Sequence, residues 1–252
     1  MEFRRIFDTI PERFDRYRPR YCPELFADLI AYAGIDGNKT VLELGPGTGQ
    51  ATEPILNTGC DYHAIELGEN LAAKMMEKFG KKPNFQITVD DFITHDFGAQ
   101  KFDMIYSAAT IQWIPEQIAF AKTFDLLKPG GVLAMMLTRG NYRESNEELY
   151  QAIQAVYKEH FVPEMTYTHG SFQYTNAINY GYTDMQRREY PTQRTLTAEE
   201  YVAFSGTHCD HIVIQPKHKE PFFSGLRNAV LAAGDRLVMH EIFVLYTARK
   251  PL

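Results

Sequence analysis

The sequence predicts an α/β fold, with a doubly wound and mostly parallel sheet that carries helices on both faces. Five short apolar runs of strand length alternate with helical segments, at residues 40–44, 62–67, 85–89, 102–107 and 132–137. Strands and helices that alternate at short intervals need crossover connections, which produce parallel pairing. The chain has 252 residues, of which 44% are hydrophobic and 23% charged, and this suits one large domain or a domain with an insertion.

The first thirty residues are predicted to be helical. Phe26, Leu29 and Ile30 share one face at helical spacing, and Pro23 suits the first turn ahead of them. Farther along, a helix is expected between the first two strands, at residues 50–56.

The next helix is expected at residues 71–79, after the second strand. Asn70 stands directly before this segment and belongs to the residue types that cap helix N-termini. We therefore expect Asn70 to cap it.

The C-terminal part follows a different pattern. Residues 141–182 are partly helical and unusually rich in aromatic side chains. They are predicted to form an insertion between late elements of the sheet, placed like a lid, although the aromatic residues could equally form a small core of their own. After a mixed stretch, a helix is expected at residues 222–233 and a final strand at residues 238–247.

Composition excludes several classes of protein. Lys and Arg number 26 against 32 Asp and Glu, a formal charge of −6, which argues against a nucleic-acid-coating protein. The apolar runs are too short to span a bilayer. Acidic residues interrupt the Arg-rich start, so neither a signal peptide nor a transit peptide is expected. The three cysteines form no disulfide or metal pattern, which suits the reducing cytoplasm. Together these observations predict a cytoplasmic protein without a membrane or nucleic-acid partner.

A glycine-rich loop follows the first strand. Gly45, Gly47 and Gly49 alternate with other residues, and glycines at this spacing let the backbone turn tightly and approach a ligand. Ligands of open parallel sheets bind outside the carboxyl ends of the strands, which is where this loop lies. A dinucleotide fingerprint would need Gly or Ala at the sixth position, where this chain has Gln50 or Thr52. The loop also lacks the Gly-Lys-Ser/Thr of a P-loop.

Further motifs follow in order. The loop at residues 43–49 reads Glu-x-Gly-x-Gly-x-Gly, and Glu66 ends the second strand, where a carboxylate can accept both ribose hydroxyls of a nucleoside. Asp91 and Phe92 follow the third strand. The segments FDMIYS and LLKPGG begin at positions 102 and 126. Together these five motifs resemble the class I S-adenosylmethionine-dependent methyltransferases, over roughly residues 36–140.

This resemblance implies a fold, a reaction and a division of the chain. The fold would be a seven-stranded Rossmann-like sheet whose last strand is antiparallel, with an inserted helical lid. The reaction would be metal-independent methyl transfer from S-adenosyl-L-methionine to a small-molecule acceptor, leaving S-adenosyl-L-homocysteine. Residues 1–35 would form an N-terminal lid helix, residues 36–140 the cofactor-binding core, residues 141–182 a lid over the acceptor, and residues 183–252 the rest of the sheet.

The two ends of the chain narrow the resemblance to small-molecule enzymes of the trans-aconitate methyltransferase-like kind. The segments at residues 14–21, 205–211 and 245–250 are similar to those of that subgroup. By this likeness the N-terminal helix folds over the cofactor, and Tyr17 and Arg18 close on its methionine carboxylate.

The cofactor-binding residues implied in this way share a place in one of these motifs. They are Tyr17, Arg18, Glu43, Gly45, Gly47, Gly49, Glu66, Leu67, Asp91, Phe92 and Ser107. Asp91 and Phe92 would hold the adenine through a polar side chain and an apolar wall. The arginines at positions 4, 5 and 13 are instead expected to form a solvated face, paired with acidic residues one helical turn away.

Three residues are candidates for contact with the acceptor. Gln112 stands where several resembling proteins have His, and an amide is no general base. Trp113 either lines the acceptor pocket or belongs to the core. Arg139 follows the fifth strand, where it could clamp a substrate carboxylate or form a surface ion pair.

No catalytic residue can be named from the sequence. His211 and Tyr21 are the weak candidates for one. A metal at residues 208–211 is disfavoured, because no second ligand cluster accompanies these His, Cys and Asp residues. We therefore expect no metal. Because Gln112 is no general base, we also expect an acceptor that is already a nucleophile, such as a nitrogen, a carboxylate oxygen or a sulfur.

Other functions stay open. One alternative is a methyltransferase that acts on RNA or protein, which the acidic composition disfavours. Another is a protein that binds the same cofactor for non-methyl chemistry, or only senses it, because a glycine loop reports the cofactor and not the reaction. The acceptor, its attacking atom and the choice between monomer and homodimer do not follow from the sequence.

Overall fold

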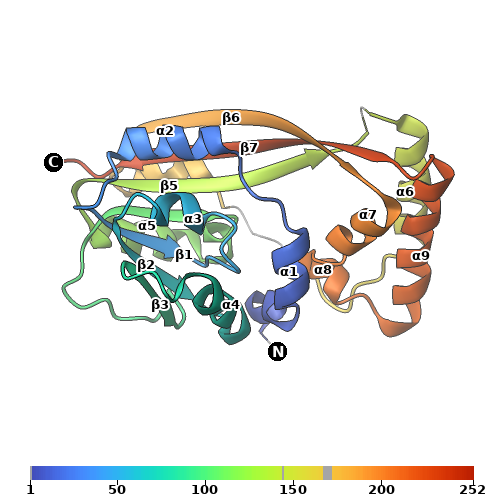
Figure 1. Cartoon of the computed structure of the whole chain (residues 1–252), viewed down its shortest axis with the longest axis horizontal. Coiled ribbons are helices and arrows are strands. Elements are labelled where there is room, and N and C mark those ends of the chain that lie inside the picture. Colours follow the sequence, from blue (N-terminus) through green and yellow to red (C-terminus); the bar gives the residue numbers. More distant parts are fainter. Residues whose placement is uncertain (1, 144, 167–171) are drawn as a thin grey trace.

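The computed structural model describes residues 2–143, 145–166 and 172–252. The described residues form a seven-stranded sheet in the order β3-β2-β1-β4-β5-β7-β6 (Figure 1). The strands are β1 Thr40–Leu44, β2 Asp61–Glu66, β3 Phe85–Val89, β4 Phe102–Ala108, β5 Leu127–Asn141, β6 Thr183–Leu196 and β7 Leu237–Arg249. Among the described strands, β7 runs antiparallel to both of its neighbours and every other pairing is parallel, so the predicted doubly wound sheet with an antiparallel last strand is confirmed.

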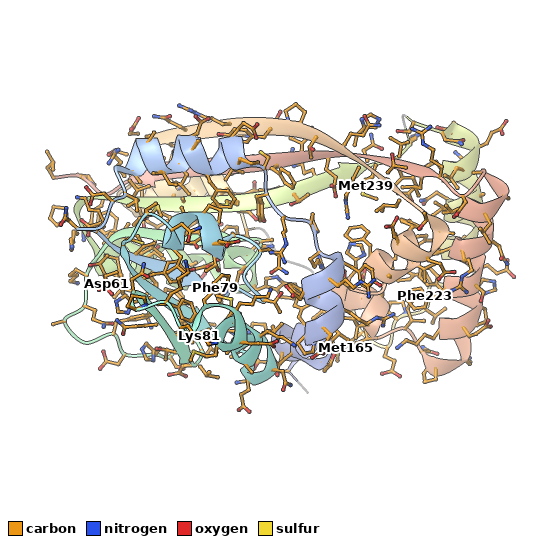
Figure 2. The ribbon with its side chains drawn as sticks, in the orientation of Figure 1. Asp61, Phe79, Lys81, Met165, Phe223 and Met239 are labelled. Atoms are coloured by element: carbon orange, nitrogen blue, oxygen red, sulfur yellow. The ribbon has the colours of Figure 1, made fainter. Side chains whose placement is uncertain are left out.

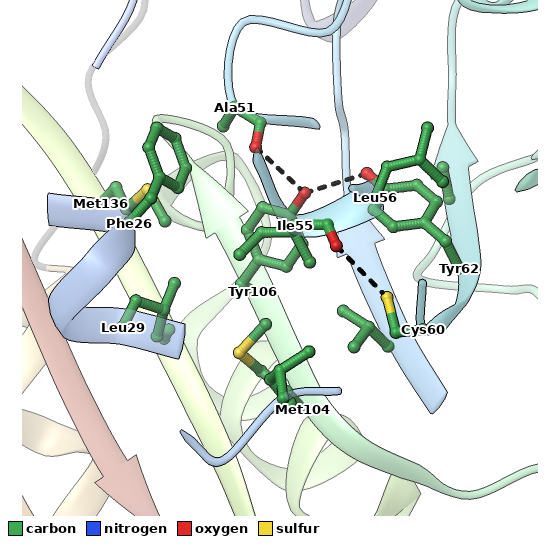
Figure 3. Packing of buried hydrophobic residues seen from close by; sticks show 14 of the residues in the cluster. Phe26, Leu29, Ala51, Ile55, Leu56, Cys60, Tyr62, Met104, Tyr106 and Met136 are labelled. Carbon is green, nitrogen blue, oxygen red and sulfur yellow. Dashed lines mark hydrogen bonds between the residues drawn. The ribbon is translucent and has the colours of Figure 1, made fainter. Parts of the chain in front are cut away.

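Helices cover both faces of the sheet. One face carries α2 (Pro23–Ala33), α3 (Thr52–Leu56) and α4 (Glu69–Phe79), and the other carries α5 (Glu116–Leu126) and the 3₁₀ helix η3 (Tyr174–Tyr180). Figure 3 shows the first of these two cores, in which Tyr62 and Tyr106 hydrogen-bond through their hydroxyls at 2.9 Å. Because side chains alternate along a strand, neighbouring residues of β1 and β4 enter different cores.

The N-terminal segment is helical, as predicted, but in three pieces. The 3₁₀ helix η1 (Phe3–Thr9) and α1 (Pro11–Tyr17) precede α2. Figure 1 shows α1 between α4 and the helices at the far end of the sheet. The predicted helix at residues 71–79 is present as α4, but its expected cap is wrong. Asp8 of η1 accepts the Leu71 amide at 2.9 Å, and Asn70 itself donates to Asp8.

A cap of four helices lies beyond the glycine-loop end of the sheet, where the long strands β5, β6 and β7 extend (Figure 1). The cap consists of α6 (Glu147–His160), α7 (Ala198–Ser205), α8 (Cys209–Ile212) and α9 (Pro216–Ala232). These helices share an apolar core of their own with the start of β7. The described helices include none with both the length and the apolar character needed to cross a membrane.

The aromatic segment at residues 141–182 is divided between two places. Its first half supplies α6 to the cap. Its second half packs on α5, where the rings of Phe172 and Tyr180 lie 5.2 Å from that of Phe120. Tyr167 lies outside the described residues. The cap thus joins helices from two separate stretches, and the division of the chain into four parts stays a prediction.

Candidate functional site

A cavity of about 420 Å³ lies at the carboxyl ends of β1, β2 and β4, between the sheet, the N-terminal segment and the cap. This is the edge at which parallel sheets bind ligands. Its volume is in the range of ordinary ligand sites. The glycine loop and the ends of β2 and β3 line one end, and tyrosines of the cap line the other.

The glycine loop forms the floor of the first end. Gly45 and Gly47 line the cavity with φ angles of +57° and +60°, a region that side chains disfavour. A Cβ at Gly47 would lie 2.9 Å from the ring of Phe14, so the loop can approach α1 only without a side chain. Gly49 does not line the cavity, because it faces Phe79 of α4.

Glu66 stands at the end of β2 and faces the cavity, although only 6% of it is exposed. Its carboxylate accepts the backbone amides of Gly47 and Gly68, each at 2.9 Å. Burial raises the pKa of Glu66 to about 7, although the hydrogen bonds from these two backbone amides act to lower it. Leu67 also lines the cavity, and its carbonyl accepts a hydrogen bond from Arg5 at 2.7 Å.

Asp91 and Phe92 line the same end of the cavity. Arg4 donates to both carboxylate oxygens of Asp91, at 3.1 and 2.6 Å, and these hydrogen bonds lower the pKa of Asp91. The expectation for Arg4 and Arg5 was therefore wrong. Both side chains reach across the cavity rim to loops far away in the sequence, rather than pairing only within their own helix, and so they hold the N-terminal segment over the site.

Arg18 lies between the two ends of the cavity. Its Nη2 donates to the carbonyl of Thr207 at 2.5 Å, and its guanidinium lies 5.5 and 5.3 Å from the ring centres of Phe7 and Phe14. Its Nε is buried and has no hydrogen-bond partner among the described residues. Burial lowers the pKa of Arg18 to about 10, so the side chain stays charged at neutral pH. Such a donor is suited to an anionic ligand group. The neighbouring Tyr17 packs in the cap and does not line the cavity.

The cap and the adjoining parts of β5 and β7 close the second end with polar and aromatic groups. Tyr142 and Tyr157 lie in the aromatic segment that was expected to cover the acceptor, whereas sequence reasoning missed Tyr201, Ser205, His208 and Glu241. Glu241 is paired with Arg194 through two hydrogen bonds of 2.7 and 2.8 Å. Tyr21 lines the cavity from below, and burial raises its pKa well above the usual range. His211, in contrast, lies behind the lining residues.

Comparisons with known proteins show which part of the chain has relatives. Residues 41–131 match a family model described as a methyltransferase domain. Malonyl-[acyl-carrier protein] O-methyltransferase 2 of Ilyobacter polytropus is 32% identical over 113 residues, 43% of each chain. Trans-aconitate 2-methyltransferase of Variovorax paradoxus is 28% identical over 154 residues, 60% of this chain and 57% of that one. Over residues 41–131 the chain is therefore similar to the class I S-adenosylmethionine-dependent methyltransferases. It spans about half, or less, of the length of the curated relatives it matches.

Solved structures show the same fold at low identity. Phosphoethanolamine N-methyltransferase 2 of Haemonchus contortus, in complex with phosphomonomethylethanolamine and S-adenosylhomocysteine, has a TM-score of 0.59 at 18% identity. That match covers 100% of this chain and 61% of the other. The [4+2]-cyclase SpnF has a TM-score of 0.52 at 15% identity, over 91% of this chain and 81% of that one. The fold of this methyltransferase family therefore does not by itself identify a reaction.

Glu43 lies outside the cavity, contrary to the expected contact with the cofactor. It is fully buried on the α3 side of the sheet, where its carboxylate accepts the hydroxyls of Tyr62 and, at 2.5 Å, of Thr52. Burial raises its pKa. Ser107 is also buried outside the cavity and accepts the Ile111 amide at 2.8 Å. Both residues shape the loops around the cavity from behind.

Two of the three predicted acceptor contacts also lie outside the cavity. Gln112 donates to the carbonyl of Ala109 at 3.0 Å and accepts the hydroxyl of Tyr174 at 3.1 Å. Arg139 is exposed and does not line the cavity, whereas its neighbours Thr138 and Gly140 do, because successive residues of β5 face opposite sides of the sheet.

Trp113 does line the cavity, and its ring lies 5.7 Å from that of Phe7. Within the described ranges, no group of three or more His, Cys, Asp or Glu side chains is placed to hold a metal ion. Independence from metal stays a prediction.

Proposed function

We propose that this protein transfers the methyl group of S-adenosyl-L-methionine to a small-molecule acceptor and releases S-adenosyl-L-homocysteine. The observation that carries the proposal is Glu66, a carboxylate buried at the end of β2 beside the glycine loop and facing the cavity. Two ribose hydroxyls would give this desolvated carboxylate the donors that it lacks beyond its two backbone amides. When bound, the cofactor supplies an electrophilic methyl group.

The remaining residues of this end fit the rest of the cofactor. Gly47 lets the loop lie against Phe14, where a Cβ would collide with the ring, and both residues line the cavity. Asp91 and Phe92 offer the adenine a carboxylate beside an apolar wall. The unpartnered Nε of buried Arg18 suits the methionine carboxylate, which would neutralise its charge.

What the chain contributes to the reaction is positioning and the exclusion of water. Phe7, Phe14 and Trp113 form an aromatic roof over the cavity, with ring centres 5.4 to 5.7 Å apart. A methyl displacement needs its two reactants held in line, and two reactants held in this way react far faster than in solution. Phe7 and Phe14 belong to the N-terminal segment, so ligand entry requires this segment to open.

A small acceptor fits better than a macromolecule. The second end of the cavity lies beneath α1 and the cap, whose tyrosines enclose it, and the chain carries a formal charge of −6. The ribosomal RNA small subunit methyltransferase A of Pseudomonas savastanoi is 31% identical, but only over 96 residues, 38% of this chain. That likeness is confined to a part shared with small-molecule relatives, so the acceptor must be argued from the cavity.

The cofactor assignment is tested by calorimetry. S-Adenosylhomocysteine should bind and NAD should not. Glu66→Ala should weaken binding about tenfold to a hundredfold, because two hydroxyls lose a charged acceptor. Asp61→Asn is the matched control, since Asp61 begins the same strand at the opposite end, remote from the cap (Figure 2). Unchanged affinity in the Glu66 variant would remove this residue from the site.

A further inference from the structure

Three side chains in hydrogen-bond contact connect the second end of the cavity, here called the acceptor end, to solvent. Tyr157 of α6 lines the cavity, and its hydroxyl lies 2.7 Å from Nε2 of His211. Nδ1 of His211 lies 2.7 Å from the carboxylate of Asp210. His211 is 5% exposed, whereas the Asp210 side chain is 38% exposed.

For a neutral His211 ring, the hydrogen atoms of these three side chains have one consistent arrangement. Burial tends to raise the pKa of Asp210, but the hydrogen bond from His211 and the charges around it lower the pKa overall, so the carboxylate is ionised and can only accept. Nδ1 of His211 therefore carries a hydrogen. Nε2 of the neutral imidazole then accepts the hydrogen of the Tyr157 hydroxyl, which leaves the lone pairs of Tyr157 Oη for a ligand in the cavity.

We propose that Tyr157, His211 and Asp210 form a proton relay that deprotonates the methyl acceptor, and that the acceptor is therefore a nucleophile that arrives with an N–H or O–H bond. The inference rests on the proposed methyl transfer. Tyr157 is the catalytic residue, because it contacts the acceptor, and His211 and Asp210 act through it.

The proton transfer balances. The N–H or O–H bond of the acceptor breaks, its proton passes to Oη of Tyr157, and its electron pair stays on the acceptor atom as the nucleophile. The hydrogen that Tyr157 held moves to Nε2 of His211. The imidazolium that forms is stabilised by contact with Asp210, whose exposed edge returns the proton to water.

His208 is the competing base, since it lines the cavity itself. Its Nδ1 lies 3.2 Å from the carbonyl of Ser205, and no carboxylate contacts it among the described residues. Burial and the charge of Arg18 lower the pKa of His208 to about 3. A proton on His208 would be opposed by Arg18, whereas one on His211 is stabilised by the carboxylate of Asp210.

The groups that face the relay come from several elements. Arg18 follows α1, His208 and Cys209 stand at the start of α8, and Tyr201 lies on α7. The titration of the relay therefore depends on these neighbours as well as on Asp210. Tyr142, which precedes α6, also faces Tyr157.

Packing holds Tyr157 in place without its hydroxyl. Its ring meets Phe222 edge-on at 5.0 Å and Phe161 at 5.2 Å. Tyr157→Phe thus removes the relay atom with little loss of contact. Tyr150→Phe is the matched control, because Tyr150 lies on the same helix and does not line the cavity.

Two readouts test the relay. The first is nitrogen NMR of His211 in the protein saturated with S-adenosylhomocysteine, which should show hydrogen on Nδ1 and none on Nε2 at neutral pH. A hydrogen on Nε2 in the neutral ring would overturn the relay, whatever the activity.

The second readout is the rate at which methyl-labelled cofactor labels a metabolite extract. Tyr157→Phe and His211→Gln should each lower the rate about 10²–10⁴-fold, the range for losing a general base. S-Adenosylhomocysteine affinity should stay within about twofold, because neither residue lies at the cofactor end. The wild-type rate should fall as the pH is lowered, because a proton already held by the relay blocks a further transfer, and Tyr157→Phe should lose this dependence.

The outcomes separate the two proposals. If the wild-type protein binds no S-adenosylhomocysteine, the proposed function fails. If binding is intact but Tyr157→Phe labels the extract as fast as Tyr150→Phe, the relay fails alone. A larger loss in His208→Gln than in His211→Gln would assign the base to His208 and overturn the relay as well.

Discussion

Replacement of Arg18 by methionine should weaken the binding of S-adenosylhomocysteine about tenfold to a hundredfold. The guanidinium stays charged, and its buried Nε has no partner in the described part of the chain, so a ligand carboxylate displaces no protein acceptor from it. A hydrogen bond to a charged group contributes about 1.5–3 kcal/mol, and each 1.4 kcal/mol is a factor of about ten in Kd. Because the site is buried, moderate salt should change this loss little.

The assay is calorimetry with two ligands. S-Adenosylhomocysteine carries the amino-acid carboxylate, and 5′-methylthioadenosine lacks it, so Arg18→Met should weaken the first and leave the second nearly unchanged. Arg16→Met is the control two residues before Arg18, because the Arg16 guanidinium lies 5.3 Å from the Tyr17 ring, outside the cavity. A melting curve for each variant shows whether the loss of the Arg18 bond to Thr207 affects stability.

Two results would refute this reasoning. An equal loss for both ligands would mean that Arg18 shapes the cavity and does not bind the carboxylate. No loss for either ligand would remove Arg18 from the cofactor site.

Three further predictions concern pH, the N-terminal segment and the expected lack of a metal. Folding raises the pKa of Glu66 from 4.5 to about 7, so the folded state binds more protons than the unfolded state between these two pH values. The ligand-free protein should therefore lose about 3 kcal/mol of stability as the pH rises from 4.5 to about 7. Urea unfolding of Glu66→Gln should show no such loss. Hydrogen exchange should show protection of residues 10–22 when S-adenosylhomocysteine binds, and protection confined to the glycine loop would contradict the closing of this segment. Labelling of a metabolite extract should survive a chelator, and loss of labelling that zinc restores would contradict this expectation. Gln112→Ala should lower the labelling rate less than about threefold, because Gln112 faces Tyr174 and no general base is lost. A much larger loss of rate in the Gln112 variant would contradict this second expectation.

The residues proposed to hold the cofactor could be predicted because they lie in short motifs at strand ends. Gly45, Gly47, Glu66 and Asp91 each follow a recognisable buried strand, and parallel pairing brings these ends together at one edge. Glu43 shows the limit of motif reasoning. It belongs to the same motif, yet the two-residue repeat of β1 directs it into the opposite core.

The same two-residue repeat, applied to β5, would have corrected the prediction that Arg139 contacts the acceptor. Its neighbours Thr138 and Gly140 were the ones to place in the cavity, since residues one apart on a strand face opposite sides. Asn70 failed for another reason. The cap of α4 comes from Asp8, more than sixty residues away, and no local pattern reports such a contact.

Most residues of the acceptor end could not be predicted from the sequence. Tyr142 and Tyr157 lie in the aromatic segment, but Tyr201 and His208 come from helices after β6, which was not predicted as a strand. β6 is an edge strand with few buried side chains, and it contains Pro191, so its sequence lacks the apolar alternation of a strand. Without β6, the return of the chain to the cap could not be foreseen.

The central claim is that the cavity joins a cofactor end to a small-acceptor end. It is tested most directly by incubating the protein with S-adenosylmethionine labelled on the methyl group and an extract that contains metabolites, RNA and protein, followed by separation by mass. We predict that label appears in a small molecule, in amounts exceeding the enzyme, and that this labelling falls with Glu66→Ala but not with Asp61→Asn. Label found only in RNA or protein, or no label despite tight cofactor binding, would contradict the claim.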